Sequence, residues 1–401
     1  VFTAGFSMKI LFVNKFLHPN GGSETYIFKL GDYLKSIGNE VQYFGMEHEG
    51  RCVSNNAEQY TTDMDFHTTS KLKKLTYPLK TIYSAEAKRK INIVLNDFKP
   101  DVIHINNFNY QLTPSILYAA AAYKKHAGKD VKIIFTAHDY QLLCPNHMMF
   151  NNGNVCEKCV GGKFINCTKS SCIHSSKAKS IIGTAEATLY KTLGAYKHFD
   201  KIICCSEFMK SKMDTNPLFA GKTVAMHNFI DAVEYTPQKK DNYVLYFGRY
   251  SKEKGIETIL NAKSIDFVCA GSGDCEDEIN KAPNIKNVGF KSGDELASLI
   301  SHAKCTVYPS VWYENCPFSV MESIMYGTPV IGARIGGIPE LIKDGETGYL
   351  FESGNTADFE SKINMILNDD ENAERMAQNC SMTRFDTVEK YCDKLLKIYN
   401  S

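Results

Sequence analysis

The stretch YVLYFGRYSKEKG, residues 243–255, decides how the second half of this chain is expected to fold. Five apolar residues in succession, Tyr243–Phe247, are typical of a strand that is covered on both faces of a parallel sheet. The glycine and the charged residues after them mark the end of the strand and the turn into a helix. Similar apolar runs recur at residues 266–270, 285–288, 305–308 and 329–331. This half is therefore expected to form a parallel sheet with helices on both of its faces.

The first half of the chain shows the same alternation of apolar runs and helical stretches. Its first apolar run is MKILFVN (Met8–Asn14), and Gly21–Gly22 then lead into an amphipathic helical stretch that Gly38 ends. Further apolar runs lie at residues 40–44, 101–106, 131–136, 201–205 and 223–227. The sequence thus predicts an α/β protein of two Rossmann-like domains, with a cleft between the C-terminal ends of their strands.

The domain boundaries follow from breaks in this alternation. A polar segment with no apolar period separates the two halves, and a final stretch with a helical period closes the chain. The predicted parts are a leader or remnant at 1–7, an N-terminal domain at 8–230, a linker at 231–242, a C-terminal domain at 243–385 and a C-terminal helix at 386–401.

Composition narrows the class of protein. With 43% apolar and 23% charged residues among 401, the chain is typical of a globular protein of two domains. A formal net charge of +1 gives no overall field for nucleic acid, so we expect no nucleic-acid partner. No apolar run approaches the roughly 20 residues that span a bilayer, and no secretion signal is recognisable. Most of the 14 cysteines stand singly, which favours a reduced, cytoplasmic protein.

The turn after the apolar run Tyr243–Phe247 carries two cations. Arg249 and Lys254 leave the strand end together, and Gly255 begins the next helix. Two cations with free backbone amides suit the two phosphates of a diphosphate. A solvated basic turn is the alternative, because a single short motif is not specific.

A pair of glutamates forms the second candidate element. The segment ENCPFSVME runs from Glu314 to Glu322, and Pro317 suits the first turn of a helix. This arrangement places Glu314 in the preceding loop and Glu322 on the helix. A carboxylate can accept hydrogen bonds from the hydroxyls of a ribose or of a sugar. Taken alone, two surface glutamates would explain the pattern equally well.

Together these stretches resemble the family 4 retaining glycosyltransferases of the GT-B fold. The matching segments are KILFVNKFLHPNGGSETYIFKLGDYLKSIGNEV, FTAHDY, GRYSKEKGIETIL, CAGSGDCE, VYPSVWYENCPFSVMESIMYGTPVIGARIGGIPELI and KDGETGYLF. They cover nearly the whole chain from Met8. The resemblance implies two Rossmann-like domains that face one another across a cleft, with the C-terminal helix packing back on the N-terminal domain.

The resemblance also implies a role for individual residues. Four would be catalytic, namely His138, Arg249, Lys254 and Glu314. The donor would be bound by Gly22, Arg249, Lys254, Gly271, Gly273, Glu314, Cys316, Phe318, Ser319 and Glu322, with Gly289–Lys291 near the nucleoside. Within this set, Arg249 and Lys254 would hold the diphosphate, Glu322 the ribose and Glu314 the transferred sugar. Asn315 and Cys316 depart from the glycine and phenylalanine that are frequent in the family, which leaves the sugar open.

The implied reaction moves a sugar from a nucleotide-diphosphate sugar, a UDP-sugar above all, to a saccharide or lipid-linked saccharide acceptor. In such retaining enzymes the departing phosphate is thought to take the acceptor proton, so His138 is not assigned as a base. No cofactor or catalytic metal is expected. A nucleotide-sugar epimerase of the same fold and a non-catalytic binding module are the alternatives. Asp63-Met64-Asp65 matches a metal signature of other glycosyltransferases, but its polar surroundings favour a solvated loop.

Residues 71–90 form a basic and partly apolar stretch. It contains Lys71, Lys73, Lys74, Lys80, Lys88, Arg89 and Lys90, with Glu86 as its only acid. Such a stretch can lie on an anionic membrane leaflet, whereas an ordinary solvated helix is the simpler interpretation. Because members of the resembled family that build surface polysaccharides often act on lipid-linked acceptors, we predict peripheral contact with the inner face of the cytoplasmic membrane.

Five cysteines crowd the segment 144–172, which follows the FTAHDY motif. Cys156 and Cys159 have the spacing of a zinc knuckle, and Cys167 with Cys172 would complete four ligands of a structural zinc. Reduced or partly disulfide-bonded thiols are the alternative, because ligand spacing alone predicts too many sites. The position of this insertion makes acceptor recognition a plausible role.

Overall fold

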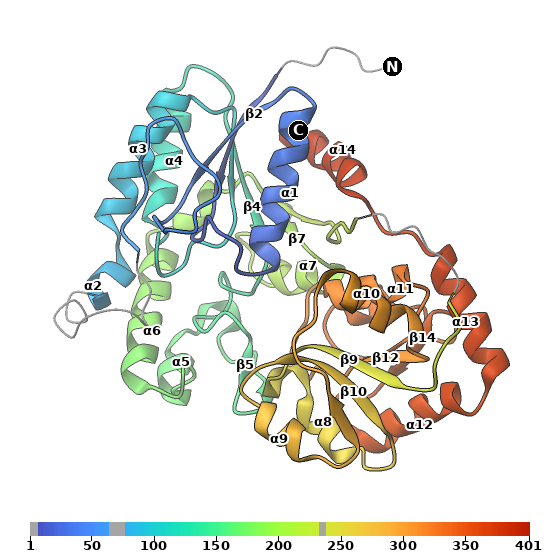
Figure 1. The fold of residues 1–401 in the computed structure, drawn as a ribbon. Helices are drawn as coiled ribbons and strands as arrows, with labels where there is room; N and C mark the ends of the chain where they lie inside the picture. The colour runs from blue at the N-terminus through green and yellow to red at the C-terminus, as the bar shows by residue number, and fades with distance from the viewer. Residues whose placement is uncertain (1–6, 64–76, 232–237) are drawn as a thin grey trace.

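Both predicted sheets form, and neighbouring strands pair in parallel throughout each of them (Figure 1). The structure is a computed structural model that describes residues 7–63, 77–231 and 238–401. The first sheet has the strand order β2-β1-β3-β4-β7-β8 and the second the order β11-β10-β9-β12-β13-β14. The prediction of an α/β protein with two parallel sheets is therefore confirmed. Residues 1–6 of the predicted leader lie outside the described residues.

The strands lie within one or two residues of the apolar runs that predicted them. Those of the N-terminal sheet are β1 (Lys9–Val13), β2 (Glu40–Phe44), β3 (Val102–Ile105), β4 (Lys132–Ala137), β7 (Lys201–Cys204) and β8 (Thr223–Ala225). Those of the C-terminal sheet are β9 (Val244–Arg249), β10 (Phe267–Ser272), β11 (Ile285–Asn287), β12 (Cys305–Tyr308), β13 (Val330–Ala333) and β14 (Gly348–Phe351). Within these two sheets the prediction missed the edge strand β14, which begins with a glycine, and it also missed the short hairpin β5 (Phe150–Asn151) and β6 (Asn154–Val155) outside them.

Helices cover both faces of each sheet (Figure 1). The N-terminal domain contains α1 (Gly22–Ser36), α2 (Tyr77–Ile82), α3 (Ala85–Phe98), α4 (Ser115–His126), α5 (Ile165–Ser170), α6 (Lys177–Thr192) and α7 (Glu207–Asp214), with the short turns η2 (Val160–Gly162) and η3 (Ala195–His198). The remaining elements are η4 (Lys252–Lys254), α8 (Ile256–Asn261), α9 (Glu276–Lys281), α10 (Gly293–His302), α11 (Phe318–Met325), η5 (Ile338–Glu340), α12 (Thr356–Leu367), α13 (Asp370–Met382) and α14 (Val388–Tyr399).

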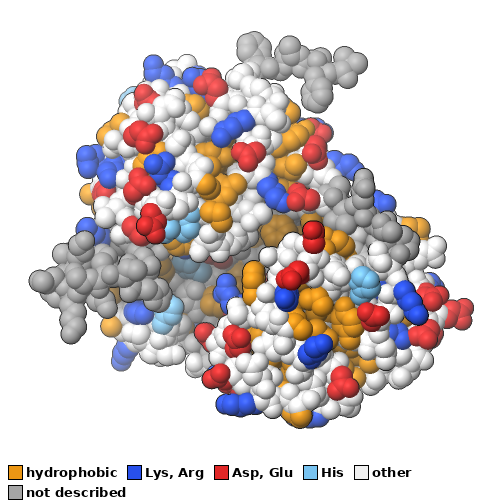
Figure 2. All heavy atoms as spheres, in the orientation of Figure 1, with side chains coloured by type: hydrophobic (Ala, Val, Ile, Leu, Met, Phe, Trp, Pro, Cys, Tyr) orange, Lys and Arg blue, Asp and Glu red, His pale blue; other side chains and the backbone are white. Residues whose placement is uncertain are grey.

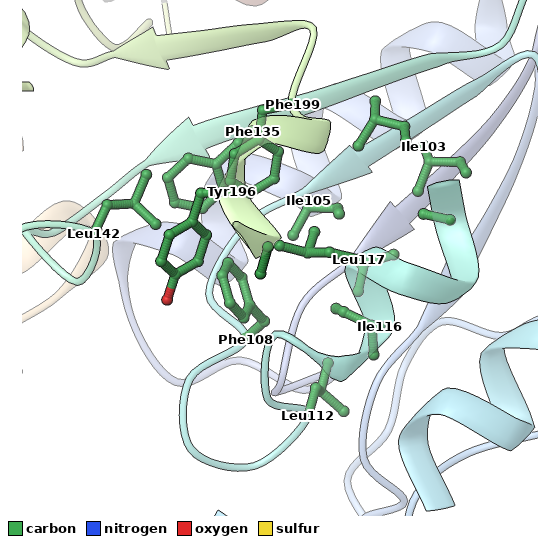
Figure 3. Close-up of a cluster of buried hydrophobic side chains, with 14 of the residues drawn as sticks. Ile103, Ile105, Phe108, Leu112, Ile116, Leu117, Phe135, Leu142, Tyr196 and Phe199 are labelled. Atoms are coloured by element: carbon green, nitrogen blue, oxygen red, sulfur yellow. The ribbon is translucent and has the colours of Figure 1, made fainter. Parts of the chain in front are cut away.

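Large apolar side chains fill the space between the N-terminal sheet and its helices. Figure 3 shows Ile105 and Phe135 of β3 and β4 against Phe108, Leu117 and other side chains, all of which are buried. The ring of Phe135 also stacks on that of Phe199, with centroids 5.0 Å apart. Burial of such side chains stabilises the fold by about 25 cal/mol per Å² of apolar surface.

The C-terminal helix α14 crosses back and completes the core of the N-terminal domain, as predicted. Its Tyr391 and Tyr399 are buried in one apolar cluster with Tyr26 of α1. The Tyr399 hydroxyl hydrogen-bonds to a ring nitrogen of His104 (2.6 Å), and the second ring nitrogen bonds to the Thr136 hydroxyl (2.7 Å). Tyr26 joins the same network through Thr136 (3.2 Å) and Tyr391 (2.9 Å). The end of the chain is thus locked into the first domain.

Strand order determines where ligands can bind. In open parallel sheets, ligands bind beyond the C-terminal ends of the strands, at the point where the strand order reverses. This point lies between β1 and β3 in the first sheet and between β9 and β12 in the second. The molecular surface is hollowed between the two domains (Figure 2). The loops that follow these strands border that cleft.

No helix in the ranges 7–63, 77–231 and 238–401 combines the length and the apolar character needed to cross a membrane.

Glu186 on α6 is a buried acid of the N-terminal domain. Its side chain is 2% exposed, and its Oε1 makes no hydrogen bond to any described residue. Tyr110, Tyr190 and Tyr196 lie close enough for its charge to affect them. Burial raises the pKa of Glu186 to about 8. The carboxyl therefore keeps its proton in the folded protein near neutral pH, whereas it loses it in the unfolded chain.

We expect the free energy of unfolding to fall as the pH rises from about 5 to about 8, because in this window only the folded state holds the Glu186 proton. The contribution of this group is as much as about 1.4 kcal/mol per pH unit. Glu186→Gln should remove this slope, whereas Glu374→Gln, at an exposed position, should preserve it. Urea unfolding at several pH values measures the effect. Parallel pH profiles for the native protein and Glu186→Gln would contradict it.

Candidate functional site

Arg249 and Lys254 both lie at the C-terminal end of β9, where the sequence placed them. Arg249 is the last residue of the strand and is exposed, and Lys254 ends the turn η4 with a side chain 22% exposed. Gly255 has φ +77°, and a Cβ there would lie 1.8 Å from the Pro309 carbonyl oxygen. A side chain could not fit, so the turn can approach the loop after β12 only with glycine at this position.

Glu314 is the most strongly anchored acid of the site. It lies in the loop after β12 and is 6% exposed. Its Oε1 accepts hydrogen bonds from Lys254 Nζ (2.6 Å), Trp312 Nε1 (2.6 Å) and Ser310 Oγ (3.1 Å). Lys254 Nζ also donates to the Tyr308 hydroxyl (3.2 Å). The structure therefore joins Lys254 and Glu314, which are 60 residues apart in the sequence, in one buried ion pair.

The GGIPE segment, residues 336–340, packs against the backbone of the loop that carries Glu314. The Gly337 N–H donates to the Glu314 carbonyl oxygen (2.7 Å). Gly336 has φ +59°, and a Cβ there would lie 2.2 Å from the same oxygen. Glycine is required at this position, since any side chain would push the glutamate loop away.

Glu322 lies on α11 and faces the N-terminal domain. The helix begins directly after Pro317, so Glu314 precedes it and Glu322 is part of it, as predicted. Burial raises the pKa of Glu322, and the charge of Lys29 on α1 acts in the opposite direction. At the start of α11, Phe318 lies so close to Gly22 that a Cβ there would be 3.3 Å from its ring. The N-termini of α1 and α11 thus meet across the cleft.

A hollow of about 290 Å³ lies beside Arg249. It is bordered by Gly271 on β10 and by Phe290 and Lys291 from the loop after β11. Phe290 is 73% exposed, which is unusual for a large apolar ring. An aromatic face at the edge of a hollow provides a surface on which a planar ring can stack.

Gly271 and Gly273 are explained by packing as well as by a ligand. A Cβ at Gly271 would lie 1.9 Å from the Gly248 carbonyl oxygen, and one at Gly273 would lie 2.5 Å from the Tyr250 carbonyl oxygen. Both positions need glycine for the close approach of β10 to β9.

His138 follows β4 and borders the cleft from the N-terminal side. Its Nε2 is 2.9 Å from Asn106 Oδ1 and donates to it, and its ring meets that of Tyr26 edge-on with centroids 5.0 Å apart. Burial lowers the pKa of His138 to about 4. The carbonyl oxygen of His138 accepts a hydrogen bond from Asn315 Nδ2 of the other domain (2.8 Å). His138 therefore enters the cleft as a neutral group.

Several residues of this site were not predicted. Ser310, Trp312 and Tyr308 surround the ion pair, and the charge of Lys29, which pairs with Asp231, acts on Glu322. Trp312 is the only tryptophan of the chain and stands two residues before Glu314, which is the signal that could have identified it. Cys316, expected at the donor, is 5% exposed and turns its thiol toward Met321 Sδ (3.7 Å). Only its backbone can serve a ligand. Ser319 lies in the first turn of α11.

The four predicted zinc ligands do not form a metal site. Across the described ranges, no group of three or more His, Cys, Asp or Glu residues could hold a metal ion. Cys167 and Cys172 lie beside each other with Sγ atoms 2.8 Å apart, and Cys159 is buried in an apolar cluster. The hydrogen bond between the thiols of Cys172 and Cys167 lowers the pKa of Cys167 and raises that of Cys172. The zinc prediction thus finds no support here, because Cys159 is used for packing.

The basic stretch is only partly available as a surface. Lys71, Lys73 and Lys74 lie outside the described residues, as do Met64 and Asp65 of the Asp63-Met64-Asp65 signature. Lys90 pairs with Glu86 (2.9 Å), and Lys88 lies over the ring of Tyr118. Arg89 is exposed.

Comparison with known proteins places this geometry in context. The family model described as "Glycosyltransferase Family 4" matches residues 20–234, and that described as "Glycosyl transferases group 1" matches residues 230–381. An uncharacterized glycosyltransferase of Methanocaldococcus jannaschii is 27% identical over 321 residues, which is 77% of this chain and 85% of that protein. The alpha-D-kanosaminyltransferase of Streptomyces kanamyceticus is 29% identical over 153 residues, 34% of this chain and 39% of that protein.

Two solved structures share the fold. The Anabaena protein HepE in complex with UDP and glucose matches with a TM-score of 0.66 and 17% identity, over 98% of this chain and 99% of that one. The sucrose-phosphate synthase of Thermosynechococcus elongatus matches with a TM-score of 0.68 and 16% identity, over 98% of each chain. At such identities the likeness shows the fold alone.

We expect His138 and His104 to remain neutral in the folded protein down to about pH 5, because burial lowers their pKa to about 4 and about 3. The unfolded chain binds these protons near pH 6.5, so the free energy of unfolding should fall as the pH drops from about 6.5 to 4. NMR titration of the ring C–H resonances measures both groups, and His138→Gln assigns one of them. The urea-unfolded chain is the control. Protonation of His138 near pH 6.5 in the folded protein would refute the neutral assignment.

Proposed function

Because the chain belongs to glycosyltransferase family 4 and has the GT-B fold, we propose that it transfers a sugar, with retention, from a UDP-sugar to a saccharide or lipid-linked saccharide acceptor. The observation that carries the proposal is the ion pair of Lys254 with the buried acid Glu314 where the strand order of the second sheet reverses, with a second cation, Arg249, exposed at the end of the same strand β9. The acceptor would occupy the N-terminal side of the cleft, in the synthesis of a surface polysaccharide or glycolipid.

Features of the C-terminal side of the cleft support the assignment of the donor to that side. Arg249 and Lys254 supply two positive charges for the diphosphate, and the free backbone amides at the start of α11 supply further donors. The hollow beside Arg249, with the exposed ring of Phe290 at its edge, suits the nucleobase. In this proposal Glu322 would hold the ribose and Glu314 the transferred sugar. The matched HepE structures hold UDP with glucose and UDP-glucose, which favours UDP as the carrier.

The proposed mechanism needs no protein base. The bond between the anomeric carbon and the phosphate oxygen breaks, and the acceptor oxygen attacks the same face of the sugar. The acceptor proton passes to the departing phosphate oxygen, so atoms and charge balance. Arg249 and Lys254 stabilise the negative charge that grows on the diphosphate, which is where fixed cations contribute most to catalysis. Because they supply this charge, we propose that the reaction does not require a metal.

His138 has a positioning role in this mechanism. Its ring is neutral, and Asn106 fixes its orientation through Nε2. A neutral imidazole can hydrogen-bond to a sugar hydroxyl without opposing a positively charged transition state. This property suits a reaction in which positive charge develops at the anomeric carbon.

The donor assignment predicts that UDP raises the melting temperature, with or without a chelator, and that Arg249→Ala weakens UDP binding about tenfold or more. Arg249 is exposed, so the variant should fold as the native protein does. Lys252→Ala removes an exposed cation three residues away and should leave UDP binding unchanged. Calorimetric titration measures the affinities.

Activity provides a second measurement of the same assignment. Lys254→Ala should lower kcat by about 100-fold, because the leaving group loses its partner. Stabilisation by a metal–nucleotide complex only, or no response to any nucleoside diphosphate, would refute the donor site. Formation of an epimerised donor in the absence of acceptor would instead favour the epimerase.

We also propose that the protein contacts an anionic membrane, which would present a lipid-linked acceptor. Besides residues 71–90, the chain from 158 to 185 contains five lysines and no acid. All five are exposed, as are Ile165 (54%) and Ile181 (50%). Helix α6 packs against both α2 and α5, so the two basic segments are neighbours. Basic and apolar groups together are what interfacial binding requires.

This contact predicts binding to vesicles of phosphatidylcholine and phosphatidylglycerol that weakens with salt. Lys177→Glu/Lys179→Glu should lower the affinity for the vesicles by at least about 30-fold, at about 1 kcal/mol per lysine near the surface. Lys281→Glu/Lys286→Glu, at exposed positions of the other domain, is the matched control. Co-sedimentation provides the measurement. Equal binding of both double variants, or none by the native protein at low salt, would exclude this surface.

A further inference from the structure

The cysteine-rich insertion reaches across the cleft to the loop that carries Glu314. Its hairpin, β5 (Phe150–Asn151) and β6 (Asn154–Val155), extends toward the C-terminal domain (Figure 1). Directly after it, Glu157 Oε1 accepts a hydrogen bond from the hydroxyl of Tyr313 (2.7 Å). Tyr313 stands between Trp312 and Glu314. One residue of the insertion is therefore hydrogen-bonded to the immediate neighbour of the buried acid of the site.

Further contacts fix the hydrogen bond between Glu157 and Tyr313 in place. Lys212 of α7 donates to the same oxygen of Glu157 (2.6 Å), and its ammonium lies 5.2 Å from the ring centre of Tyr313. The ring of Tyr313 packs against Phe208 (4.8 Å between centroids) and Tyr140 (6.3 Å). Although partial burial acts to raise it, these hydrogen bonds hold the pKa of Glu157 below its ordinary value. Glu157 is thus a charged acceptor shared by both domains.

The buried thiol of Cys159 and two backbone hydrogen bonds fix the segment that carries Glu157. Cys159 is 6% exposed and packs with Phe164 and Cys167 in a small apolar cluster. The Glu157 carbonyl oxygen accepts the N–H of Val160 (3.0 Å), which begins η2, and the N–H of Cys156 donates to the Met149 carbonyl oxygen (2.7 Å). The carboxylate is therefore carried by a short segment that is fixed at both ends. Such anchoring lets one side chain hold a loop of the opposite domain.

We infer that Glu157 is a positioning residue, which through Tyr313 holds the loop of Trp312 and Glu314 against the N-terminal domain and so favours the closed cleft. The inference rests on the proposed function in so far as Glu314 serves the donor sugar. The cysteine-rich insertion would then affect the donor side of the cleft, because it positions the loop that carries Glu314. Residues that bind UDP from the C-terminal domain alone, such as Arg249, are independent of this contact.

Trp312 provides a direct readout of the contact. It is the only tryptophan of the chain, and its Nε1 donates to Glu314 (2.6 Å). In the ligand-free protein, Glu157→Ala and Tyr313→Phe should each move its emission to longer wavelength and increase its quenching by acrylamide. The double variant should do no more than either single one, because both remove the same contact. Tyr313→Phe keeps the ring, and hence its packing on Phe208.

Conservative and control variants separate positioning from general destabilisation. Glu157→Gln keeps an acceptor oxygen for Tyr313 and should keep the native emission. Lys158→Ala alters the exposed neighbouring residue and should leave the Trp312 emission of the ligand-free protein unchanged. With a UDP-sugar donor, Glu157→Ala should lower kcat about tenfold while the Kd for UDP changes by less than about twofold. A merely structural role would lower the melting temperature without this split.

The outcomes are distinguishable. Unchanged Trp312 emission in both Glu157→Ala and Tyr313→Phe, or additive effects in the double variant, would overturn the inference. These results do not depend on any donor, since they are obtained without ligand. Failure of the native protein to bind UDP would instead count against the proposed function, while a red-shifted Trp312 in the variants would still establish the contact.

Discussion

A carboxylate almost fully removed from water must be compensated, and the arrangement of the cleft follows from this requirement at Glu314. Lys254, Ser310 and Trp312 all donate to its Oε1, at 2.6, 3.1 and 2.6 Å. Lys254 follows β9 and Glu314 follows β12, so the ion pair links the two strands between which the sheet order reverses. Removing one partner of such a pair leaves an uncompensated charge, which costs several kcal/mol. The site is therefore organised before any ligand arrives.

A second acid, Glu340, joins the two domains. Its carboxylate accepts the backbone N–H groups of Glu207 and Phe208 (2.8 and 2.7 Å) at the start of α7, where a negative charge is favourable. The two places where the chain crosses between domains also lie side by side, since the Ile230 N–H donates to the Asp386 carbonyl oxygen (3.0 Å). Domains joined by polar contacts generally retain some relative motion, so a contact across the cleft can affect how closed it is.

The sequence predicted those features that depend on local pattern. Apolar runs identified the strands because parallel strands are covered on both faces, and Pro317 separated the loop of Glu314 from α11. Partners distant in the sequence could not be predicted, because spacing says nothing about which loops meet. The pairing of Lys254 with Glu314 and the contact of Glu157 with Tyr313 are of this kind. The zinc prediction found no support for the same reason. A Cys-x-x-Cys spacing brings two thiols close along the chain, but the packing of the fold determines the direction in which each side chain points.

The end of the chain also shapes the cleft, although it lies far from the donor side. Tyr391 of α14 bonds to the hydroxyl of Tyr26 (2.9 Å), and the ring of Tyr26 meets His138 edge-on. Burial by such neighbours is what keeps His138 neutral. If α14 were displaced, Tyr26 would lose a buried partner and His138 would gain contact with water. The return of α14 to the first domain therefore does more than close the fold, because through Tyr26 it contributes to the burial that lowers the pKa of His138.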